Sequence, residues 1–426
     1  MQLKIHRGSR EIGGSCVELT SENSRIIIDT GLPLSATGNE DCKDLIPATL
    51  TDSLKQLHPP LEGILISHPH QDHYGLLEHI KPNIPLYAGG AASELIKLTY
   101  IMQGKHNLFA QPITFKPERS FKLGDFNITP YLVDHSGFDS YAFLIECDGK
   151  RVFYSGDFRE HGRKGNLFQL LKNKLPRIDT LLLEGTMVGQ ERKDTLSETE
   201  LEERFEKSIK QTEGIVFVTL SSQNIDRIVT IFRACKKSGR NMVIDPYTAE
   251  ILDKLKNHYI LQRKKCNIPH PSWPEIHVCF PKELCEWMKR NGNKQIVQRY
   301  NKYGKRWEYF SKNASRFVMF VRPSATEELI NKNYFDLSKA RWIYSLWEGY
   351  IEKDPKTTKF ASQLKNRGVT FEHLHTSGHA DIDTLKKLVD ITKPEKTIPI
   401  HTLNPHLYKD FFPKVVEASD GIAIDI

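Results

Sequence analysis

The chain has 426 residues and a net charge of +7, and it contains seven cysteines. The length exceeds the size of a usual single hydrophobic core and predicts more than one structural unit, while the odd cysteine count without a Cys-x-x-Cys pair excludes a disulfide framework and a zinc ribbon. No run reaches the ~18 apolar residues that span a bilayer, and residues 1–10 lack an apolar signal core, so we expect a cytoplasmic protein that does not enter membranes.

The first two strand-like segments lead into residues that can bind metal. The apolar run 26–28 ends at Asp29, and the run 63–67 leads into residues 68–73, which read His-Pro-His-Gln-Asp-His. Neutral imidazole and carboxylate are ligands that suit zinc and similar ions. A chance cluster of this kind would be a solvated loop or a histidine pair in the core, but the density of ligand types favours a metal site.

Two further strand-like segments end at candidate ligands. Residues 128–135 end at His135, and residues 151–157 end at Asp157. A single acid at a strand end is more often a turn residue, because Asp hydrogen-bonds its own backbone there. The pattern recurs in four strands, and each ion needs several donors with one position left open. The sequence therefore predicts two Zn²⁺ ions per chain, with Mn²⁺ as the alternative metal.

The middle of the chain has the pattern of an α/β unit. Residues 197–200, Ser-Glu-Thr-Glu, form a capping box that predicts a helix through about residue 211. A strand-like run at 214–218, a helix-like run at 225–237 and a strand-like run at 241–244 follow. This alternation predicts a small parallel sheet.

The segment 289–316 combines positive charge with aromatic rings. It holds nine basic residues against one acid, Glu308, a local charge of +8. Basic groups can follow a phosphate backbone while rings stack on bases, so we expect single-stranded RNA to contact Lys302, Lys305 and Arg306. The alternative is a solvated helix whose aromatic residues pack inward.

Two motifs near the C-terminus carry further histidines. Residues 375–380 read His-Thr-Ser-Gly-His-Ala and precede a helix with apolar residues at 382, 385, 388 and 389. A turn that opens a helix presents backbone amides and could bind phosphate through His375, Ser377 and Gly378, although a plain helix cap is the simpler interpretation. The strand-like run 397–401 ends at His401, which alone could be a buried core histidine.

Together these motifs resemble the metallo-β-lactamase fold, with its ordered Asp, His-x-His-x-Asp-His, His and Asp, and the three added motifs of the β-CASP nucleases at Glu184, His379 and His401. The resemblance is strongest to the ribonuclease J group. It implies an α/β protein, an αββα sandwich over residues 1–196 and 361–426, with an inserted α/β β-CASP domain over residues 197–360.

The resemblance also implies roles for the residues of the site. It assigns one metal to His68, His70 and His135, the second to Asp72, His73 and His401, and the bridge between them to Asp157. Asp72 and Asp29 would support catalysis, Asp29 by holding ligands in place. His379 would stabilise or protonate the leaving oxygen, and Glu184 would orient its imidazole.

The implied function is hydrolysis of RNA phosphodiester bonds that leaves 5′-phosphate and 3′-hydroxyl ends, by 5′-to-3′ exonuclease action, endonuclease action or both. A DNA nuclease of the same family is the nearest alternative, but valine typically stands at the position of His401 there. A small-molecule hydrolase would lack the inserted domain. A catalytically inactive RNA-binding scaffold and a homodimer stay open.

Overall fold

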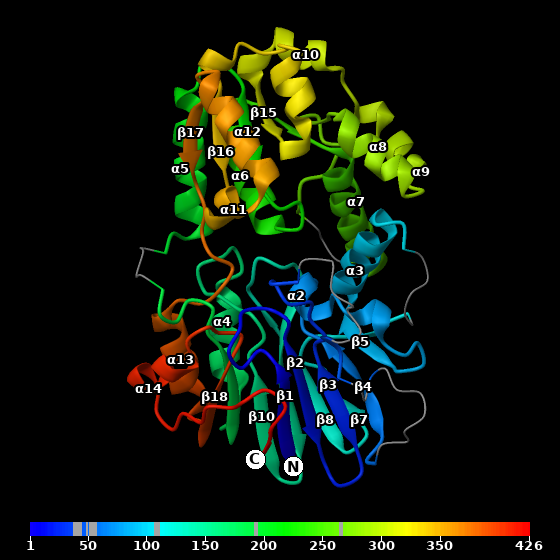
Figure 1. Cartoon of the computed structure of the whole chain (residues 1–426), viewed down its shortest axis with the longest axis vertical. Coiled ribbons are helices and arrows are strands. Elements are labelled where there is room, and N and C mark those ends of the chain that lie inside the picture. Colours follow the sequence, from blue (N-terminus) through cyan, green and yellow to red (C-terminus); the bar gives the residue numbers. More distant parts are fainter. Residues whose placement is uncertain (37–44, 48–49, 51–57, 106–110, 191–194, 264–266) are drawn as a thin grey trace. The chain divides into compact units, whose positions relative to one another are not determined.

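The computed structural model describes residues 1–36, 45–47, 50, 58–105, 111–190, 195–263 and 267–426. The chain divides into two compact units (Figure 1). The first comprises Met1–Ile96, Asn107–Asp194 and Gly378–Ile426, and the second comprises Lys97–His106 and Thr195–Ser377.

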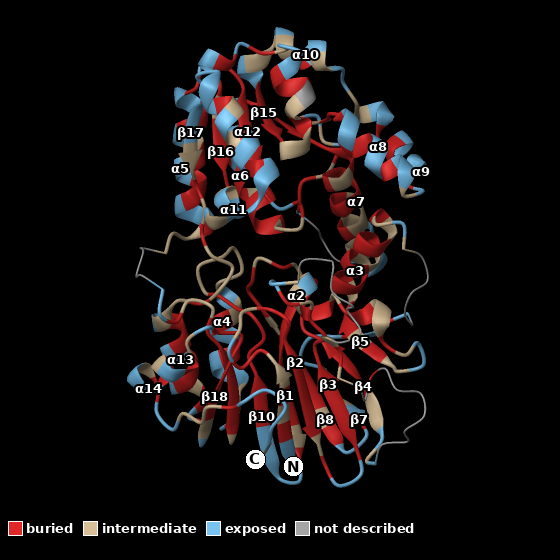
Figure 2. Ribbon diagram, in the orientation of Figure 1, coloured by how far each residue is buried: buried red, intermediate tan, exposed pale blue. Residues whose placement is uncertain are grey.

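The first unit contains two sheets. The seven-stranded sheet has the order β19 (Ala423–Asp425), β1 (Gln2–Arg7), β2 (Cys16–Thr20), β3 (Arg25–Ile28), β4 (Leu61–Ile66), β5 (Leu86–Gly89) and β6 (Ile113–Phe115). The six-stranded sheet has the order β18 (Lys396–Ile400), β11 (Thr180–Glu184), β10 (Lys150–Tyr154), β9 (Ser140–Cys147), β8 (Phe126–Val133) and β7 (Phe121–Leu123). Figure 2 shows how fully these strands are buried.

The two sheets pack face to face because alternate strand residues are apolar on the inner side. Leu3 and Ile26 of one sheet share a buried cluster with Phe143 and Leu182 of the other. The opposite face of the six-stranded sheet packs against α4 (Asn166–Lys174), α13 (Ile382–Thr392) and α14 (Tyr408–Phe411). The predicted fold class, an α/β sandwich with an inserted second α/β unit, is confirmed.

The second unit is built on a six-stranded parallel sheet. Its order is β14 (Ile276–Val278), β13 (Asn241–Ile244), β15 (Phe317–Phe320), β12 (Val216–Thr219), β16 (Arg341–Tyr344) and β17 (Thr370–His373). Along the chain, these strands alternate with helices. The helix α5 (Glu198–Gln211) precedes β12, α6 (Ile225–Lys237) precedes β13, and α7 (Pro246–Leu261) precedes β14. The Ser197 capping box is present, with the side chain of Glu200 closing it.

The second unit extends beyond the expected exit near residue 360. β17 pairs in parallel with β16, and these main-chain hydrogen bonds keep the chain in the second unit as far as Ser377. The segment Lys97–His106 also belongs to it, because Gln223 donates to the hydroxyl of Thr99 and the amide of Asn293 donates to main-chain carbonyls of that segment. Neither pairing has a local signal in the sequence.

No helix that the structure describes is both long and apolar enough to cross a lipid bilayer.

A buried ion pair stabilises the second unit. Arg227 on α6 and Glu198 on α5 are both fully buried, and a guanidinium nitrogen lies 3.0 Å from the carboxylate of Glu198. Arg227 also donates to the main-chain carbonyl of Ser345. We expect Arg227→Met to lower the free energy of unfolding by ~3–5 kcal/mol, because the carboxylate of Glu198 would stay buried without its cation.

Urea unfolding of the full chain measures this cost. The matched control is Arg177→Met, because Arg177 pairs with Glu395 at 3.1 Å while both side chains are about half exposed or more. Exposed pairs contribute ~0–1 kcal/mol, so the two substitutions should differ clearly. If the two variants lose the same free energy of unfolding, burial does not determine how much the pair of Arg227 and Glu198 stabilises the fold.

Candidate metal centre

Asp29 organises the strand ends around the centre. It follows β3 with φ +60°, a left-handed conformation that Asp tolerates better than most residues. Its carboxylate accepts hydrogen bonds from Ser67, through the amide at 2.8 Å and the hydroxyl at 2.7 Å, and from the hydroxyl of Tyr154 at 2.8 Å. The Nδ1 of His73 lies 2.7 Å from the same carboxylate. Asp29 therefore holds the ring of His73 so that its Nε2 points away from Asp29.

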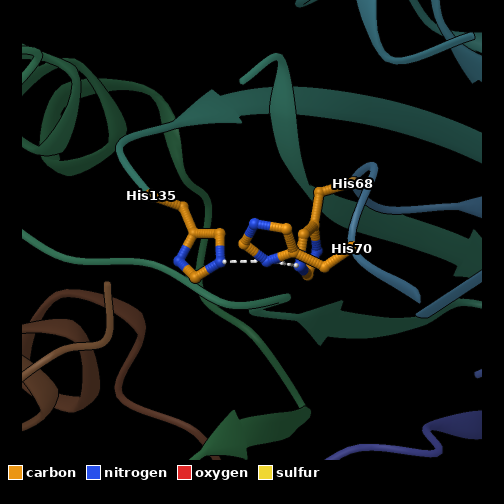
Figure 3. A group of neighbouring side chains, drawn as sticks. All are labelled: His68, His70 and His135. Carbon is orange, nitrogen blue, oxygen red and sulfur yellow. Dashed lines mark hydrogen bonds between the residues drawn. The ribbon is translucent and has the colours of Figure 1, made fainter. Parts of the chain in front are cut away.

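Three imidazoles converge in the first group of candidate ligands. The Nδ1 of His70 lies 3.2 Å from the Nε2 of His68 and 3.1 Å from the Nε2 of His135, and Figure 3 shows these nitrogens facing one another. The Nδ1 of His135 lies 2.6 Å from the carbonyl of Gly378, which keeps the proton on that side of the ring. Burial lowers the pKa of His70 to about 4 and holds the pKa of His68 and His135 well below the usual value.

Neutral imidazoles at this spacing present lone pairs to one another. Two facing nitrogens can share one proton, but three cannot all be satisfied in that way. A cation among them would accept all three lone pairs. Gly137 leaves the room for this arrangement, because a Cβ there would lie 3.1–3.3 Å from ring carbons of the three histidines.

A second group joins Asp72 and His73 from the short helix α2 (Gln71–Tyr74) with Asp157 and His401, and one ligand atom from each lies within 4.8 Å of the others. The Nε2 of His73 lies 3.2 Å from Oδ2 of Asp157, and the Nε2 of His401 lies 3.3 Å from Oδ2 of Asp72. Neither His73 Nε2 nor Asp157 Oδ2 has a hydrogen bond of acceptable geometry, although both atoms are buried. Such buried and unsatisfied atoms fit a cation site.

Asp157 belongs to both groups by position. Its Oδ2 lies 3.7 Å from the Nε2 of His68 and 3.8 Å from the Nε2 of His401, so one oxygen faces an imidazole of each group. Burial alone would raise the pKa of Asp157, but the surrounding histidines, led by His401 and His73, hold it well below the usual value. An ionised carboxylate that faces imidazoles of both groups is the donor arrangement that two divalent cations need.

The protonation of His73 supports the same conclusion. Burial alone would lower the pKa of His73, but the carboxylates of Asp157, Asp29 and Asp72 raise it well above the usual value. These negative charges favour a positive charge at the ring, which a second proton supplies when no cation is bound. A divalent ion at Nε2 would supply it instead. The residues present therefore fit a two-cation centre.

Glu184 and His379 form the third group, with Asp157 and His401. The Nδ1 of His379 lies 3.3 Å from Oε2 of Glu184. Burial lowers the pKa of His379, but Glu184 and Asp157 outweigh burial and raise it to about 9. Glu184 also accepts the main-chain amides of Phe158, Thr186 and Ala380, at 3.2, 3.2 and 3.3 Å. The acid therefore orients the imidazole and holds three separate loops.

Sequence reasoning missed several supporting side chains. Ser67 and Tyr154 share the carboxylate of Asp29, and the hydroxyl of Thr186 lies 2.9 Å from the Nδ1 of His401. Each hydroxyl fixes a ring or a carboxylate that can bind metal, which is how residues around a metal site keep its ligands in place. The signal for Ser67 was available, because a polar residue ends an otherwise apolar strand beside the histidine motif. Tyr154 carried no such signal.

The turn that we predicted to bind phosphate, at residues 375–380, differs from its expected geometry. The turn at residues 375–380 does not open α13 directly, since Asp381 caps that helix by accepting the amide of Thr384 at 2.8 Å. The main-chain amide of Ala380 donates to the carboxylate of Glu184 and is therefore not free for a phosphate. Gly378 belongs to the first unit and Ser377 to the second. A phosphate contact at Ser377 and Gly378 stays a prediction that depends on the turn alone.

The second unit contains the remaining predicted contact residues. His375 lies there with its Nδ1 3.4 Å from the carbonyl of Ser345, and burial and the nearby Arg227 lower its pKa to about 3. A neutral imidazole would bring no positive charge to a phosphate group.

The basic segment is not one helix. It contains α9 (Lys294–Arg299) and α10 (Trp307–Lys312) with a 3₁₀ turn between them. Tyr300 is buried and donates to Glu250 at 2.8 Å, and Trp307 stacks on Tyr334 with ring centroids 5.8 Å apart, so these rings pack inward. Of the two alternatives left open for the aromatic residues, Tyr300 and Trp307 follow inward packing.

The predicted RNA contacts of this segment remain accessible. Lys302 and Arg306 are exposed, and the ammonium groups of Lys302 and Lys305 lie over the rings of Tyr303 and Tyr309, 4.9 and 5.4 Å from the centroids.

Comparison with known proteins finds similarity to metallo-hydrolases over two parts of the chain. The family model described as the beta-lactamase superfamily domain matches residues 24–203, and the Zn-dependent metallo-hydrolase RNA specificity domain matches residues 368–409. Ribonuclease J of Helicobacter pylori strain B128 is 23% identical, over 92% of this chain and 55% of that protein. Ribonuclease J of Mycoplasma genitalium is 22% identical, over 92% of this chain and 66% of that protein.

The chain spans little more than half the length of the Helicobacter relatives that it matches. Among solved structures, a protein of unknown function from Enterococcus faecalis V583 matches over 99% of both chains, with a TM-score of 0.80 and 18% identity. At that identity the match shows a shared fold.

Proposed function

We propose, on the premise that the chain belongs to the ribonuclease J-like β-CASP family of the metallo-β-lactamase fold, that it hydrolyses phosphodiester bonds of RNA at a centre for two divalent cations. The observation that carries this proposal is the shared position of Asp157 between the two groups of candidate ligands. RNA is the substrate class because the last part of the chain matches an RNA specificity domain and because His401 takes part in the second group.

The bound cations would lower the pKa of an attacking water toward neutrality and offset the charge that develops at phosphorus. Asp157 and Asp72 would supply the negative charge that stabilises the second cation. Asp29 fixes His73, and Thr186 fixes His401, so that each ring presents one nitrogen in a set orientation. This preorganisation reduces the rearrangement that the reaction requires.

His379 has the properties of an acid for the leaving oxygen. Its raised pKa keeps it protonated at neutral pH, and the carboxylate of Glu184 lies 3.3 Å from its Nδ1. A proton at Nε2 is then available to the leaving oxygen. If the 3′ oxygen leaves, the products carry 5′-phosphate and 3′-hydroxyl ends, and the same chemistry serves 5′-to-3′ exonuclease and endonuclease action.

A 5′-labelled single-stranded RNA with either a monophosphate or a hydroxyl end tests the proposal. Release of labelled mononucleotide indicates exonuclease action, and internal fragments indicate endonuclease action. A DNA of the same sequence should be cleaved more slowly. RNA that is bound and never cleaved, with or without added zinc or manganese, would favour an inactive RNA-binding scaffold.

We expect two transition-metal ions per chain in gently purified protein. Asp72, His73, Asp157 and His401 supply one set of donors, and three further histidines supply the other. Elemental analysis measures the ratio, and a chelator should remove both the metal and the activity. Zinc or manganese added back should restore cleavage, whereas magnesium, which prefers oxygen donors, should restore it poorly. Full cleavage by metal-free protein would contradict the two-cation centre.

The exposed cations of the basic segment should contact RNA phosphates. We expect Lys302→Ala, Lys305→Ala and Arg306→Ala together to weaken RNA binding and to reduce the slope of log affinity against log salt by up to ~0.7 per lost contact. The control replaces three exposed lysines elsewhere in the second unit, namely Lys207, Lys332 and Lys365. If both triple variants change the slope equally, net charge explains the effect and the segment is a solvated surface.

A further inference from the structure

The second unit contains a cavity of about 740 Å³ that the proposed catalytic centre does not use. Its lining includes Ser324 of the 3₁₀ turn Pro323–Ala325, residues of α8 (Lys282–Arg290) and Lys356 near the start of α12 (Pro355–Asn366). That 3₁₀ turn follows β15 (Phe317–Phe320) after two residues, so the cavity lies at the carboxyl end of the parallel sheet. Ligands of open α/β sheets bind outside this end of the strands, and the volume is within the range of small-ligand sites.

One face of α8 points into this cavity. Glu283, Trp287 and Arg290 follow the i, i+4, i+7 spacing that aligns residues along one side of a helix, and all three line the cavity. The opposite side of the helix is buried through Cys285 and Met288, while Leu284 is buried and also contributes to the lining of the cavity. Trp287 is therefore a surface residue and does not belong to the hydrophobic core. It is 37% exposed and stands on the open side of a well-anchored helix.

The charge around the indole favours an anionic ligand. Lys282, Arg290 and Lys356 line the cavity and form no ion pair within the part of the chain that the structure describes. Of the two acids in the lining, Glu286 is neutralised by Lys289, which lies 2.9 Å away. Arg290 is also the second residue of the basic segment 289–316, so positive charge continues from the cavity along the chain.

We propose that this cavity binds a nucleotide of single-stranded RNA as a second contact of the substrate, with the base stacked on Trp287 and the phosphates near Lys282 and Arg290. The inference depends on the proposed function for the choice of RNA. An aromatic face with neighbouring cations is the usual means by which proteins hold single strands without reading their sequence. The contact should therefore be sequence-tolerant and should need bases as well as phosphates.

The test compares an oligoribonucleotide with a chain of the same length that lacks bases. Binding is measured in the whole 426-residue chain carrying Asp72→Asn, so that the RNA stays intact. Trp287→Ala should weaken binding of the normal RNA by about 5- to 100-fold, the effect of one lost base–aromatic stack, and should leave binding of the abasic chain unchanged. Trp287→Phe should restore most of the affinity. The matched control is Trp347→Ala, because Trp347 is 48% exposed in the same unit but does not line the cavity.

Unchanged RNA affinity in Trp287→Ala, or equal losses in the Trp287 and Trp347 variants, would overturn the proposed contact. If adenosine monophosphate competes as strongly as the RNA, the ligand of the cavity is a free nucleotide and not a strand. That result would also overturn the proposed contact. The catalytic proposal is tested separately in protein with Asp72 intact. Trp287-dependent binding without any RNA cleavage would leave this contact standing and refute the catalytic function.

Discussion

Asp72→Asn should abolish RNA cleavage, with a loss of about a thousand-fold or more in kcat, and should leave RNA affinity within a few-fold. The carboxylate of Asp72 lies 3.3 Å from His401 and faces the second group of ligands. Burial alone would raise the pKa of Asp72, but His73 and His401 hold it well below the usual range, so the group is ionised. An amide of the same shape removes one negative charge from the second cation, whose stabilisation of the reaction is worth several kcal/mol.

Single-turnover cleavage, RNA binding and metal content of the same preparation measure this prediction. Metal content should fall from two ions to about one per chain, which separates loss of a cation from loss of folding. Asp410→Asn is the matched control, since Asp410 is exposed on α14 and the change in charge is identical. Turnover near the wild-type rate in the Asp72 variant would remove Asp72 from the mechanism.

His379→Ala should lower the cleavage rate by ~100- to 10,000-fold, the loss that is typical for a general acid. The effect should be in kcat and should be equal for RNA with a 5′-monophosphate and a 5′-hydroxyl end, because an acid for the leaving group acts in the transition state. The protonated ring is the active form. The wild-type rate should therefore fall as the pH rises through the pKa of His379, which Glu184 and Asp157 raise to about 9. Bound cations act in the opposite direction, so this value is an upper limit.

The pH profile distinguishes an acid from a structural residue. His379→Ala should lose the alkaline limb that the wild type shows, and a leaving group that needs no proton should be cleaved at nearly the wild-type rate. His406→Ala, which removes an exposed histidine from the same unit, should change neither the rate nor the profile. If the His379 variant keeps the alkaline limb, another group supplies the proton.

The candidate ligands could be predicted from the sequence because each follows a short apolar strand. Parallel strands place their carboxyl ends at one edge of a sheet, so ligand residues that are far apart in the chain meet there. His68 after β4 and Asp157 after β10 follow this rule, whereas His135 follows β8, whose neighbours in the sheet are antiparallel. The resemblance to a known family ordered the ligands into two groups.

The supporting residues and the limit of the second unit could not be predicted in the same way. Thr186 supports His401 only because β11 and β18 are neighbours in the sheet, which local periodicity does not reveal. The second unit ends at Ser377 because of the pairing of β17 with β16, a contact between strands about 30 residues apart in the chain. The position of the turn at residues 375–380 relative to α13 could not be predicted either, because the helix starts a few residues later and a capping aspartate lies between them.

The insertion of the second unit between the ligands also sets the order in which the protein can mature. His379 and His401 follow the whole segment 195–377, and β18 can pair with β11 only after that segment has been synthesised. A chain that is still being translated therefore carries the three-histidine group and lacks part of the second. A centre built in this way stays incomplete during translation until His401 has been synthesised and β18 has paired with β11.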